Sequence, residues 1–265
     1  MKVGFIGLGN MAKAIIGGIL RNNIVAAEDI LGSAKTDETK DKVKKEFGIT
    51  IMPDNKEVAK ASDVLFLAVK PIFFPEVMEE IKDCIKEDTL VISVAAGKTV
   101  EFIENGLCNP KLKIVRCMPN TPALVGEGCT GVCVNSNVSD KDTETAMNIL
   151  SSFGKAYLVP ERLMDVVGAV SGSSPAFVFM FIEAMADGAV AGGMPRKQAY
   201  EFAAQAVLGS AKLVMDSGKH PGELKDMVCS PGGTTIEGVK VLEESGLRGA
   251  VMDAMEAVLE KTKRL

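Results

Sequence analysis

Two glycines and an alanine near the start of the chain, Gly7, Gly9 and Ala12, have the spacing of a phosphate-binding turn. The apolar residues 2–6 before them predict a strand, and residues 11–20 after them predict a helix with one apolar side. Gly7 allows a tight turn off the strand, and Gly9, which has no side chain, lets a pyrophosphate approach the backbone. Ala12 lets the helix pack closely against the strand, and the N–H groups at the helix start favour a bound anion. Together they predict a dinucleotide-binding fold in preference to a purely structural glycine-rich turn.

The tip of the second predicted strand, which ends near residue 32, indicates which dinucleotide binds. Sites for NAD carry an acidic residue there, which holds the ribose 2′-hydroxyl. This chain has Ser33 and Lys35 instead, and a hydroxyl and a cation suit a 2′-phosphate. We therefore expect NADP as the cofactor, with NADPH preferred. The neighbouring Asp37 leaves NADH possible, and a solvated polar loop is the alternative interpretation.

A second unusual stretch lies at residues 230–236, with the sequence Ser-Pro-Gly-Gly-Thr-Thr-Ile. Gly232 and Gly233 stand directly before a predicted helix, where several backbone N–H groups can face a small anion such as a carboxylate. Ser230, Thr234 and Thr235 add hydroxyl groups to the same loop. An ordinary capped loop is the alternative.

Short apolar runs alternate with helical stretches over the first part of the chain, which predicts an α/β fold with a mainly parallel sheet and helices on both faces. Ligands of such sheets bind at the carboxyl ends of the strands. Three unusual segments fall at such ends, at 68–71, 95–97 and 118–122. The predicted strands are 2–6, 29–32, 49–52, 64–68, 89–95, 113–118, 129–135 and 155–159, and the helices predicted among them are 11–20, 39–47, 55–60, 75–85 and 141–153.

No strand-like run returns after Pro160, so we expect a Rossmann-type domain at residues 1–160 and an all-helical domain at residues 161–265. Residues 176–191 contain only two charges, Glu183 and Asp187, on one helical face. Such a helix must be buried on most sides, either against another subunit or in the core of its own domain. The helices of this domain are expected at 161–170, from 175 to about 192, from 195 to about 218, from 221, at 234–244 and at 247–263, with a break at 171–174.

The composition of the 265 residues narrows the possible partners. The net charge of −5 and the aromatic content of 5% disfavour a nucleic-acid binder, which needs basic and stacking side chains. No signal peptide or membrane-spanning run is predicted, because polar residues interrupt the apolar stretches. The six cysteines form no Cys-x-x-Cys pair and the only histidine is His220. We therefore expect reduced thiols, no metal site and a cytoplasmic protein.

Five motifs closely resemble, in this order, those of pyrroline-5-carboxylate reductase. They are Gly-Leu-Gly-Asn-Met at 7–11, Ala-Val-Lys-Pro at 68–71, Met-Pro-Asn-Thr-Pro at 118–122, Ser-Gly-Ser-Ser-Pro-Ala at 171–176 and Ser-Pro-Gly-Gly-Thr-Thr at 230–235. The resemblance covers nearly the whole chain. It implies an N-terminal NAD(P)-binding domain, a C-terminal helical dimerisation domain, and a homodimer or larger homo-oligomer. It also implies the reduction of 1-pyrroline-5-carboxylate to L-proline, the last step of proline biosynthesis.

The resemblance further implies roles for individual residues. Residues 6–11 would hold the pyrophosphate, Ser33 and Lys35 would lie near the adenosine phosphate, and residues 95–97 near the nicotinamide half. The implied cofactor-binding residues are Ile6, Gly7, Leu8, Gly9, Asn10, Met11, Ser33, Lys35, Asn55, Ala68, Val69, Lys70, Pro71, Ala95, Ala96 and Gly97. The implied substrate-binding residues are Ser230, Gly232, Gly233, Thr234 and Thr235. The chain departs from the family at Ser174, usually Gly, at Phe177, commonly Tyr, and at Met227, where some members have a substrate-contacting Asn.

The implied substrate is a cyclic imine that carries a carboxylate, so the protein mainly has to position it against the cofactor. No histidine or acidic residue lies in the 230–236 loop. Thr235 is therefore the candidate catalytic residue, as the hydrogen-bond partner of the imine nitrogen, with the proton coming ultimately from solvent or the iminium binding already charged. One alternative is a β-hydroxyacid dehydrogenase, whose chemistry needs a lysine base that residues 176–191 lack. The other is a non-catalytic NADP-binding module.

Overall fold

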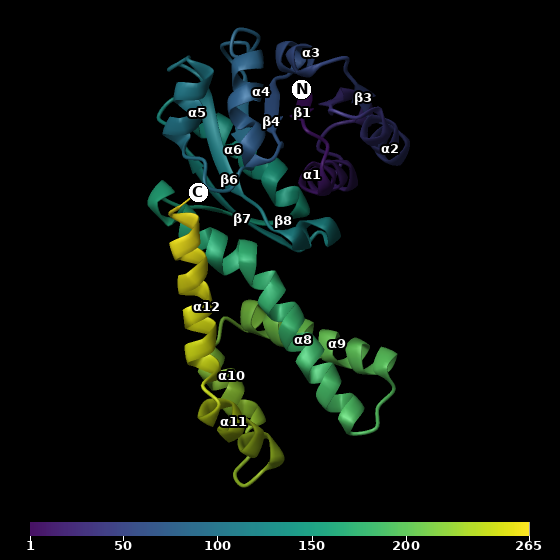
Figure 1. The fold of residues 1–265 in the computed structure, drawn as a ribbon, viewed down its shortest axis with the longest axis vertical. Coiled ribbons are helices and arrows are strands. Elements are labelled where there is room, and N and C mark those ends of the chain that lie inside the picture. Colours follow the sequence, from purple (N-terminus) through teal and green to yellow (C-terminus); the bar gives the residue numbers. More distant parts are fainter. Residues whose placement is uncertain (265) are drawn as a thin grey trace. The chain divides into compact units, whose positions relative to one another are not determined.

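The computed structural model describes residues 1–264, and they form two compact units (Figure 1). The first unit contains residues 1–173 together with residues 261–264, and the second contains residues 174–260. The first is built from strands and helices, whereas every element from 174 to 260 is a helix.

One eight-stranded sheet forms the centre of the first unit, with the strand order β3-β2-β1-β4-β5-β6-β7-β8. Neighbouring strands are parallel except β6 and β7, which pair antiparallel. The chain runs outward from β1 through β2 to β3 and then returns to β4 on the other side of β1, which creates a switch point between β1 and β4. The strands are β1 Val3–Ile6, β2 Ile30–Ser33, β3 Thr50–Ile51, β4 Val64–Leu67, β5 Leu90–Ser93, β6 Lys113–Met118, β7 Gly128–Val134 and β8 Gly154–Leu158.

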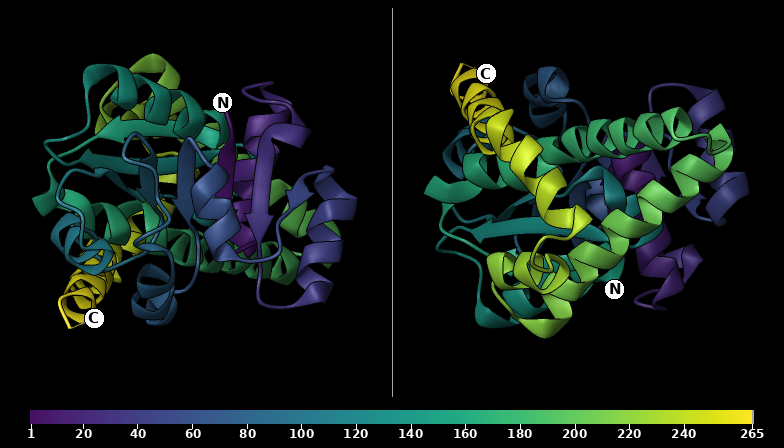
Figure 2. Two further views of the ribbon diagram at one scale, coloured as in Figure 1. Left: turned by 90° about the horizontal axis from the view of Figure 1, so that it is seen from above. Right: turned by 90° about the horizontal axis from the view of Figure 1, so that it is seen from below.

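Helices cover both faces of this sheet (Figures 1 and 2). Residues of α1, α2 and α6 pack into one buried cluster, and residues of α3, α4, α5 and α7 pack into another. All residues of β1, β2, β4 and β5 are buried, as expected for strands covered on both sides. The predicted α/β class is thus confirmed. The helices are α1 Asn10–Arg21, α2 Asp37–Phe47, α3 Asn55–Ala61, α4 Phe74–Ile81, α5 Val100–Leu107, α6 Asp140–Leu150 and α7 Met164–Val167.

Two features of the first unit were not predicted. Helix α5 begins after Thr99, whose hydroxyl accepts a hydrogen bond from the Phe102 N–H. It ends at Leu107, and Cys108, the residue that follows, has a φ of 52°. Helix α4 ends at Ile81 instead of continuing to residue 85, because residues 82–84 form a turn in which the Cys84 N–H donates to the Ile81 carbonyl.

The predicted helix break at residues 171–174 is wrong, since the chain is helical without interruption from 161 to 191. The stretch Gly168–Ser173 forms a π-helical turn between α7 and the next helix. Asn120, which is 7% exposed, donates from Nδ2 to the Ser171 carbonyl at 2.9 Å. Gly168 and Gly172 leave room for the Met118 side chain, whose Cε would lie 3.4 and 3.1 Å from a Cβ added at these positions. Small residues here widen the helix where a neighbouring side chain contacts it, and they do not end it.

Five helices make up the second unit: α8 Ser174–Ala191, α9 Arg196–Ser217, α10 Pro221–Val228, α11 Thr234–Glu244 and α12 Leu247–Thr262. Helices α8 and α9 pack through Ala186, Ala199 and Ala203, which form a small buried cluster. The Arg196 guanidinium pairs with the Asp187 carboxylate across the same contact. Gly193, with φ of 95°, and Gly218, with φ of 63°, occupy the turns that end the two helices.

Most of α8 is exposed in the single chain. Phe179 is 60% exposed and Met180 67% exposed, and Ala186 is the buried residue of the helix. By length and hydropathy the helical stretch 161–191 could cross a membrane, and among residues 1–264 it is the one stretch that meets both criteria. Only 11% of its most apolar window is buried among the described residues.

Candidate active site

The glycine turn after β1 leaves open space beside the start of α1. Gly7 has a φ of 93°, and its N–H donates to the Ser33 carbonyl at 3.0 Å. A Cβ at Gly7 would lie 2.7 Å from the Ala68 carbonyl oxygen, so a side chain there would clash with backbone. Gly9 has an ordinary φ of −76°, and a Cβ added there would meet no atom of the described residues within 4 Å. Gly7 therefore shapes the turn, whereas Gly9 keeps the adjacent space free.

The N-terminus of α1 is open to an anion. Gly9 is its N-cap, no side chain of the described residues caps it, and its first turn contains no acidic residue. The N–H groups of Asn10, Met11 and Ala12 therefore have no acceptor within the helix, and the helix dipole favours negative charge at this point. These features fit a phosphate or pyrophosphate group.

The tip of β2 carries a chain of three hydrogen-bonded side chains. Ser33 is the last residue of β2 and is 2% exposed. Its Oγ donates to Asn55 Oδ1 at 2.7 Å, and Asn55 Nδ2 donates to Glu80 Oε2 at 2.7 Å. The ammonium of the exposed Lys35 lies 5.6 Å from the centre of the Phe73 ring. The sequence singled out Ser33, Lys35 and Asn55, but no sequence pattern pointed to Glu80. Glu80 reaches Asn55 only because α4 packs beside α3.

The segments that follow β4 and β5 reach the same edge of the sheet. The Ala68 N–H donates to the Ile6 carbonyl at 2.9 Å, and the Val94 N–H donates to the Leu67 carbonyl at 3.4 Å. Gly97 turns the chain with φ of 70°. The structure thus brings the sequence-predicted cofactor residues together at the carboxyl ends of β1, β2, β4 and β5, where parallel sheets bind ligands.

Arg116 on β6 holds the beginning of the 161–191 helix. It is 5% exposed, and its Nη1 and Nη2 lie 3.1 Å from Glu161 Oε1 and 3.3 Å from Asp165 Oδ1. The same Glu161 oxygen accepts the Val100 N–H at 2.8 Å, at the start of α5. Burial, with a smaller effect of Glu161, raises the pKa of the Cys133 thiol to about 11. The buried Arg116, paired with two carboxylates, links β6 to the start of the 161–191 helix. The sequence alone did not reveal this link.

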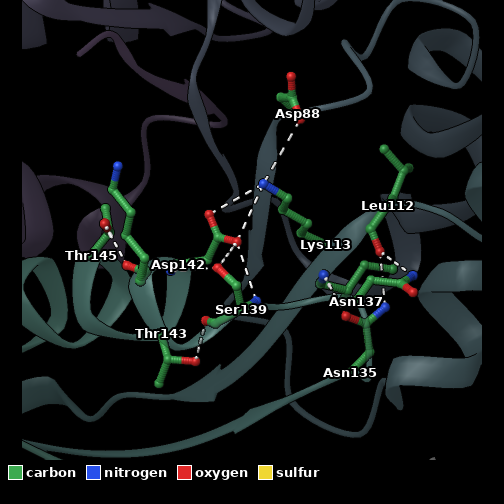
Figure 3. Close-up of polar contacts among 11 residues, drawn as sticks. Asp88, Leu112, Lys113, Asn135, Asn137, Ser139, Asp142, Thr143 and Thr145 are labelled. Atoms are coloured by element: carbon green, nitrogen blue, oxygen red, sulfur yellow. Dashed lines mark hydrogen bonds and ion pairs between the residues drawn. The ribbon is translucent and has the colours of Figure 1, made fainter.

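Another polar cluster lies at the opposite end of β6 (Figure 3). Lys113 Nζ is 3.2 Å from Asp142 Oδ2 and 3.9 Å from Asp88 Oδ1. The Ser139 hydroxyl caps α6, and the Asp142 carboxylate accepts the Ser139 N–H in return. Partial burial acts to raise the pKa of Asp142, but the hydrogen bonds from Ser139 and Lys113 outweigh it and hold this pKa below its usual range. Because these groups satisfy one another, we interpret the cluster as structural.

In the second unit, the loop at residues 230–233 leads into a helix whose start is also uncapped. Gly232 has a φ of 67°, and the Gly233 N–H donates to the Ser230 carbonyl at 3.0 Å. Gly233 is the N-cap of α11, and no side chain of the described residues caps this helix. Thr234 and Thr235 are exposed in its first turn, which also contains Glu237. The loop therefore presents free backbone N–H groups beside two hydroxyls.

His220 has a structural role. Its Nδ1 accepts the Gly222 N–H at 3.1 Å and so caps α10, which begins at Pro221. Among residues 1–264, no group of three or more His, Cys, Asp or Glu side chains is arranged to hold a metal ion.

A mainly parallel sheet with a glycine turn and an open helix start at its switch point, followed by a helical unit, defines a Rossmann-type dinucleotide-binding protein with a helical C-terminal domain. Residues 2–97 match the family described as NADP oxidoreductase, coenzyme F420-dependent, and residues 161–265 match pyrroline-5-carboxylate reductase dimerisation. The chain belongs to the pyrroline-5-carboxylate reductase family. Its C-terminal domain is a dimerisation domain, so the protein is a homo-oligomer.

Individual relatives support this assignment over the full length. The pyrroline-5-carboxylate reductase of Escherichia coli strain K12 is 51% identical over 264 residues, which cover 100% of this chain and 98% of the relative. The structure of the Coxiella burnetii enzyme is 34% identical with a TM-score of 0.92, covering 99% of this chain and 97% of that one. The structure of the Plasmodium falciparum enzyme, solved with NADP bound, is 35% identical with a TM-score of 0.89. The match covers 100% of this chain and 97% of that one. The predicted family is confirmed, and the roles of single residues remain predictions.

Proposed function

We propose that this protein reduces 1-pyrroline-5-carboxylate to L-proline, with NADPH as the preferred reductant and NADH as a possible one. This is the last step of proline biosynthesis. The observation that carries the proposal is the uncapped start of α11 beside the exposed Thr235, in a chain that belongs to the pyrroline-5-carboxylate reductase family. An uncapped helix start binds a carboxylate, and a hydroxyl next to it can bond a ring nitrogen.

The first unit would hold the cofactor. The open N-terminus of α1 fits the pyrophosphate, and the space beside Gly9 lets it approach the backbone. Ser33, Lys35 and Asn55 would surround the 2′ position of the adenosine ribose, and residues 68–71 and 95–97 would border the rest of the dinucleotide. The bound NADP in the Plasmodium falciparum relative supports this choice of cofactor. Replacing Ser33 with Asp should weaken NADPH binding more than NADH binding, and an equal loss would show that this position does not read the phosphate.

The second unit would hold the substrate. The carboxylate of the substrate would accept hydrogen bonds from the free N–H groups at the start of α11, with the hydroxyls of Ser230 and Thr234 beside it. The Thr235 hydroxyl would donate to the imine nitrogen, or accept from it if the ring binds as an iminium. When bound, the reduced nicotinamide supplies the hydride. A threonine hydroxyl is a weak acid, so the proton on nitrogen would come ultimately from solvent.

A NADPH oxidation assay with 1-pyrroline-5-carboxylate, run beside a panel of β-hydroxyacids with NADP, tests this proposal. Turnover of the imine with proline as the product supports it. Turnover of hydroxyacids alone would instead indicate a β-hydroxyacid dehydrogenase, although α8 lacks the lysine that such chemistry needs. Cofactor binding without turnover of any substrate would indicate a non-catalytic NADP-binding module.

We further propose that the homo-oligomer is a dimer or a larger assembly in which partner chains cover α8. The exposed apolar side chains Phe179 and Met180 support this proposal. We also propose a cytoplasmic protein that binds neither membranes nor nucleic acids. Flotation with liposomes and a nucleic-acid shift assay would each contradict it if the protein bound.

A further inference from the structure

Glu80 is the last member of the hydrogen-bonded series Ser33, Asn55, Glu80, which begins at the tip of β2. Its Oε2 accepts from Asn55 Nδ2 at 2.7 Å, and Asn55 Oδ1 accepts from Ser33 Oγ at 2.7 Å. Ser33 is 2% exposed, whereas Asn55 and Glu80 are half-buried. The three residues come from β2, α3 and α4, so their hydrogen bonds depend on how these elements pack.

The carboxylate of Glu80 fixes the direction of both hydrogen bonds that link Ser33, Asn55 and Glu80. A carboxylate can only accept hydrogen bonds, so the Asn55 amide must turn its NH₂ group towards Glu80. Its carbonyl oxygen then faces Ser33 and can only accept, so the Ser33 hydroxyl must donate inward to Asn55. The Ser33 oxygen is left with lone pairs alone for any ligand atom that reaches it.

This direction matters for the two cofactors because their 2′ groups differ in hydrogen-bonding ability. The ribose 2′-hydroxyl of NADH can donate to the lone pairs of Ser33, but the 2′-phosphate of NADPH only accepts. Lys35, which is exposed near the same strand tip, favours the phosphate. The strand tip therefore contains one feature that favours NADPH and one that favours NADH.

We propose that Glu80 is a positioning residue that limits the preference for NADPH, by holding Asn55 and through it Ser33 in the arrangement that suits a 2′-hydroxyl. The inference rests on the proposed cofactor site at the tip of β2, and it assigns a selectivity role to a residue that need not touch the cofactor. In Glu80→Gln the new amide can donate to Asn55, which lets the Asn55 amide turn round and frees the Ser33 hydroxyl to donate outward.

The test is the ratio of the dissociation constants of NADP and NAD, measured by direct titration of the intact oligomer. Glu80→Gln should shift this ratio towards NADP by roughly three- to tenfold, the range expected for one hydrogen bond gained. Glu79→Gln is the matched control, because it removes an equal charge from the neighbouring exposed residue, whose carboxylate pairs with Lys82. Glu80→Met, which removes the acceptor and keeps a good helix former, is the second variant and should shift the ratio in the same direction.

Two further measurements separate a fixed hydrogen-bond direction from simple charge removal. The shift should persist at high salt, because a purely Coulombic effect near the surface is screened. It should disappear when Glu80→Gln is combined with Asn55→Ala, since Glu80 acts through Asn55. An unchanged ratio in both Glu80 variants, an equal shift in Glu79→Gln, or a shift that survives the loss of Asn55 would overturn the inference. Failure of the proposed reductase reaction would instead appear as absent turnover in the unaltered protein, with these binding ratios unaffected.

Discussion

Replacing Gly7 and Gly9 in turn by alanine should separate the two jobs of the glycine turn, folding and cofactor binding. Gly7 has a φ of 93°, a region in which a residue with a side chain is strained by about 1–3 kcal/mol. The added Cβ would also lie 2.7 Å from the Ala68 carbonyl oxygen and 2.9 Å from Val69 Cγ1, which costs about 1–3 kcal/mol more. Alanine restricts the unfolded chain and returns about 0.4–1 kcal/mol. Gly7→Ala should therefore lower the free energy of unfolding by about 1–6 kcal/mol.

Gly9→Ala should leave stability nearly unchanged. Its φ of −76° suits alanine, and the added Cβ would meet no atom of the described residues within 4 Å. Alanine is a poorer N-cap than glycine by about 0.5–1 kcal/mol, and this offsets the gain from the restricted unfolded chain. The methyl group would, however, occupy the space through which the pyrophosphate approaches α1. Loss of one charge-assisted hydrogen bond, about 1.5–3 kcal/mol, predicts cofactor binding weaker by roughly ten- to a hundredfold.

The assay is urea unfolding followed by far-ultraviolet circular dichroism at one fixed protein concentration, together with cofactor titration. The chain has no tryptophan, so intrinsic fluorescence would report little, and a fixed concentration is needed because subunit association adds to stability. The reasoning would be refuted if Gly9→Ala destabilised the protein as much as Gly7→Ala does, or if Gly9→Ala bound the cofactor as tightly as the unaltered protein.

Three further predictions concern other parts of the chain. Thr235→Val keeps the β-branched shape but removes the hydroxyl, and it should lower kcat/KM by about ten- to a hundredfold, or 1–3 kcal/mol, with cofactor binding unchanged. Thr235→Ser should keep much of the activity, and a fully active valine variant would remove this hydroxyl from the mechanism. Met180→Lys places a charge on the exposed apolar face of α8 and should dissociate the oligomer or prevent folding, whereas light scattering that finds an intact assembly would contradict this interface. Thr130 is fully buried on β7 and its Oγ1 has no hydrogen-bond partner among the described residues, so Thr130→Val should raise the free energy of unfolding by about 1 kcal/mol, visible as a higher urea midpoint.

The parts of the fold that local patterns determine were predictable from the sequence. Apolar runs bounded by turn residues located every strand, and β6 matches its predicted bounds, Lys113–Met118. The glycine turn gave the class of protein because each small residue meets a local requirement, as the φ of Gly7 and the close approach of Ala68 illustrate. Pro195 and Pro221 correctly located the beginnings of α9 and α10.

The remaining features depend on contacts between residues far apart in the sequence. The antiparallel pairing of β7 with β6 does not follow from an apolar pattern that either direction would satisfy. Gly-Ser-rich residues 171–174 resemble a helix break, but Asn120, 51 residues before Ser171, holds this stretch within a wider helical turn. The buried Ser33 of β2 donates to Asn55 of α3, which in turn donates to Glu80 of α4, and no local spacing encodes that arrangement.

The order of elements along the chain has a consequence for how the protein is made. All eight strands lie before residue 159, so the complete sheet leaves the ribosome before α8 does and can fold while synthesis continues. The apolar surface of α8 emerges afterwards, and under the interface proposed above it stays uncovered until the newly made chain meets another copy. Encounter of two copies is second order in protein concentration, so the lifetime of this exposed state lengthens as expression falls. At low expression the newly made protomer is therefore the form most open to chaperones and proteases. A variant that weakens only the α8 contacts would reduce the amount of protein in the cell before it reduced the activity of each assembled oligomer.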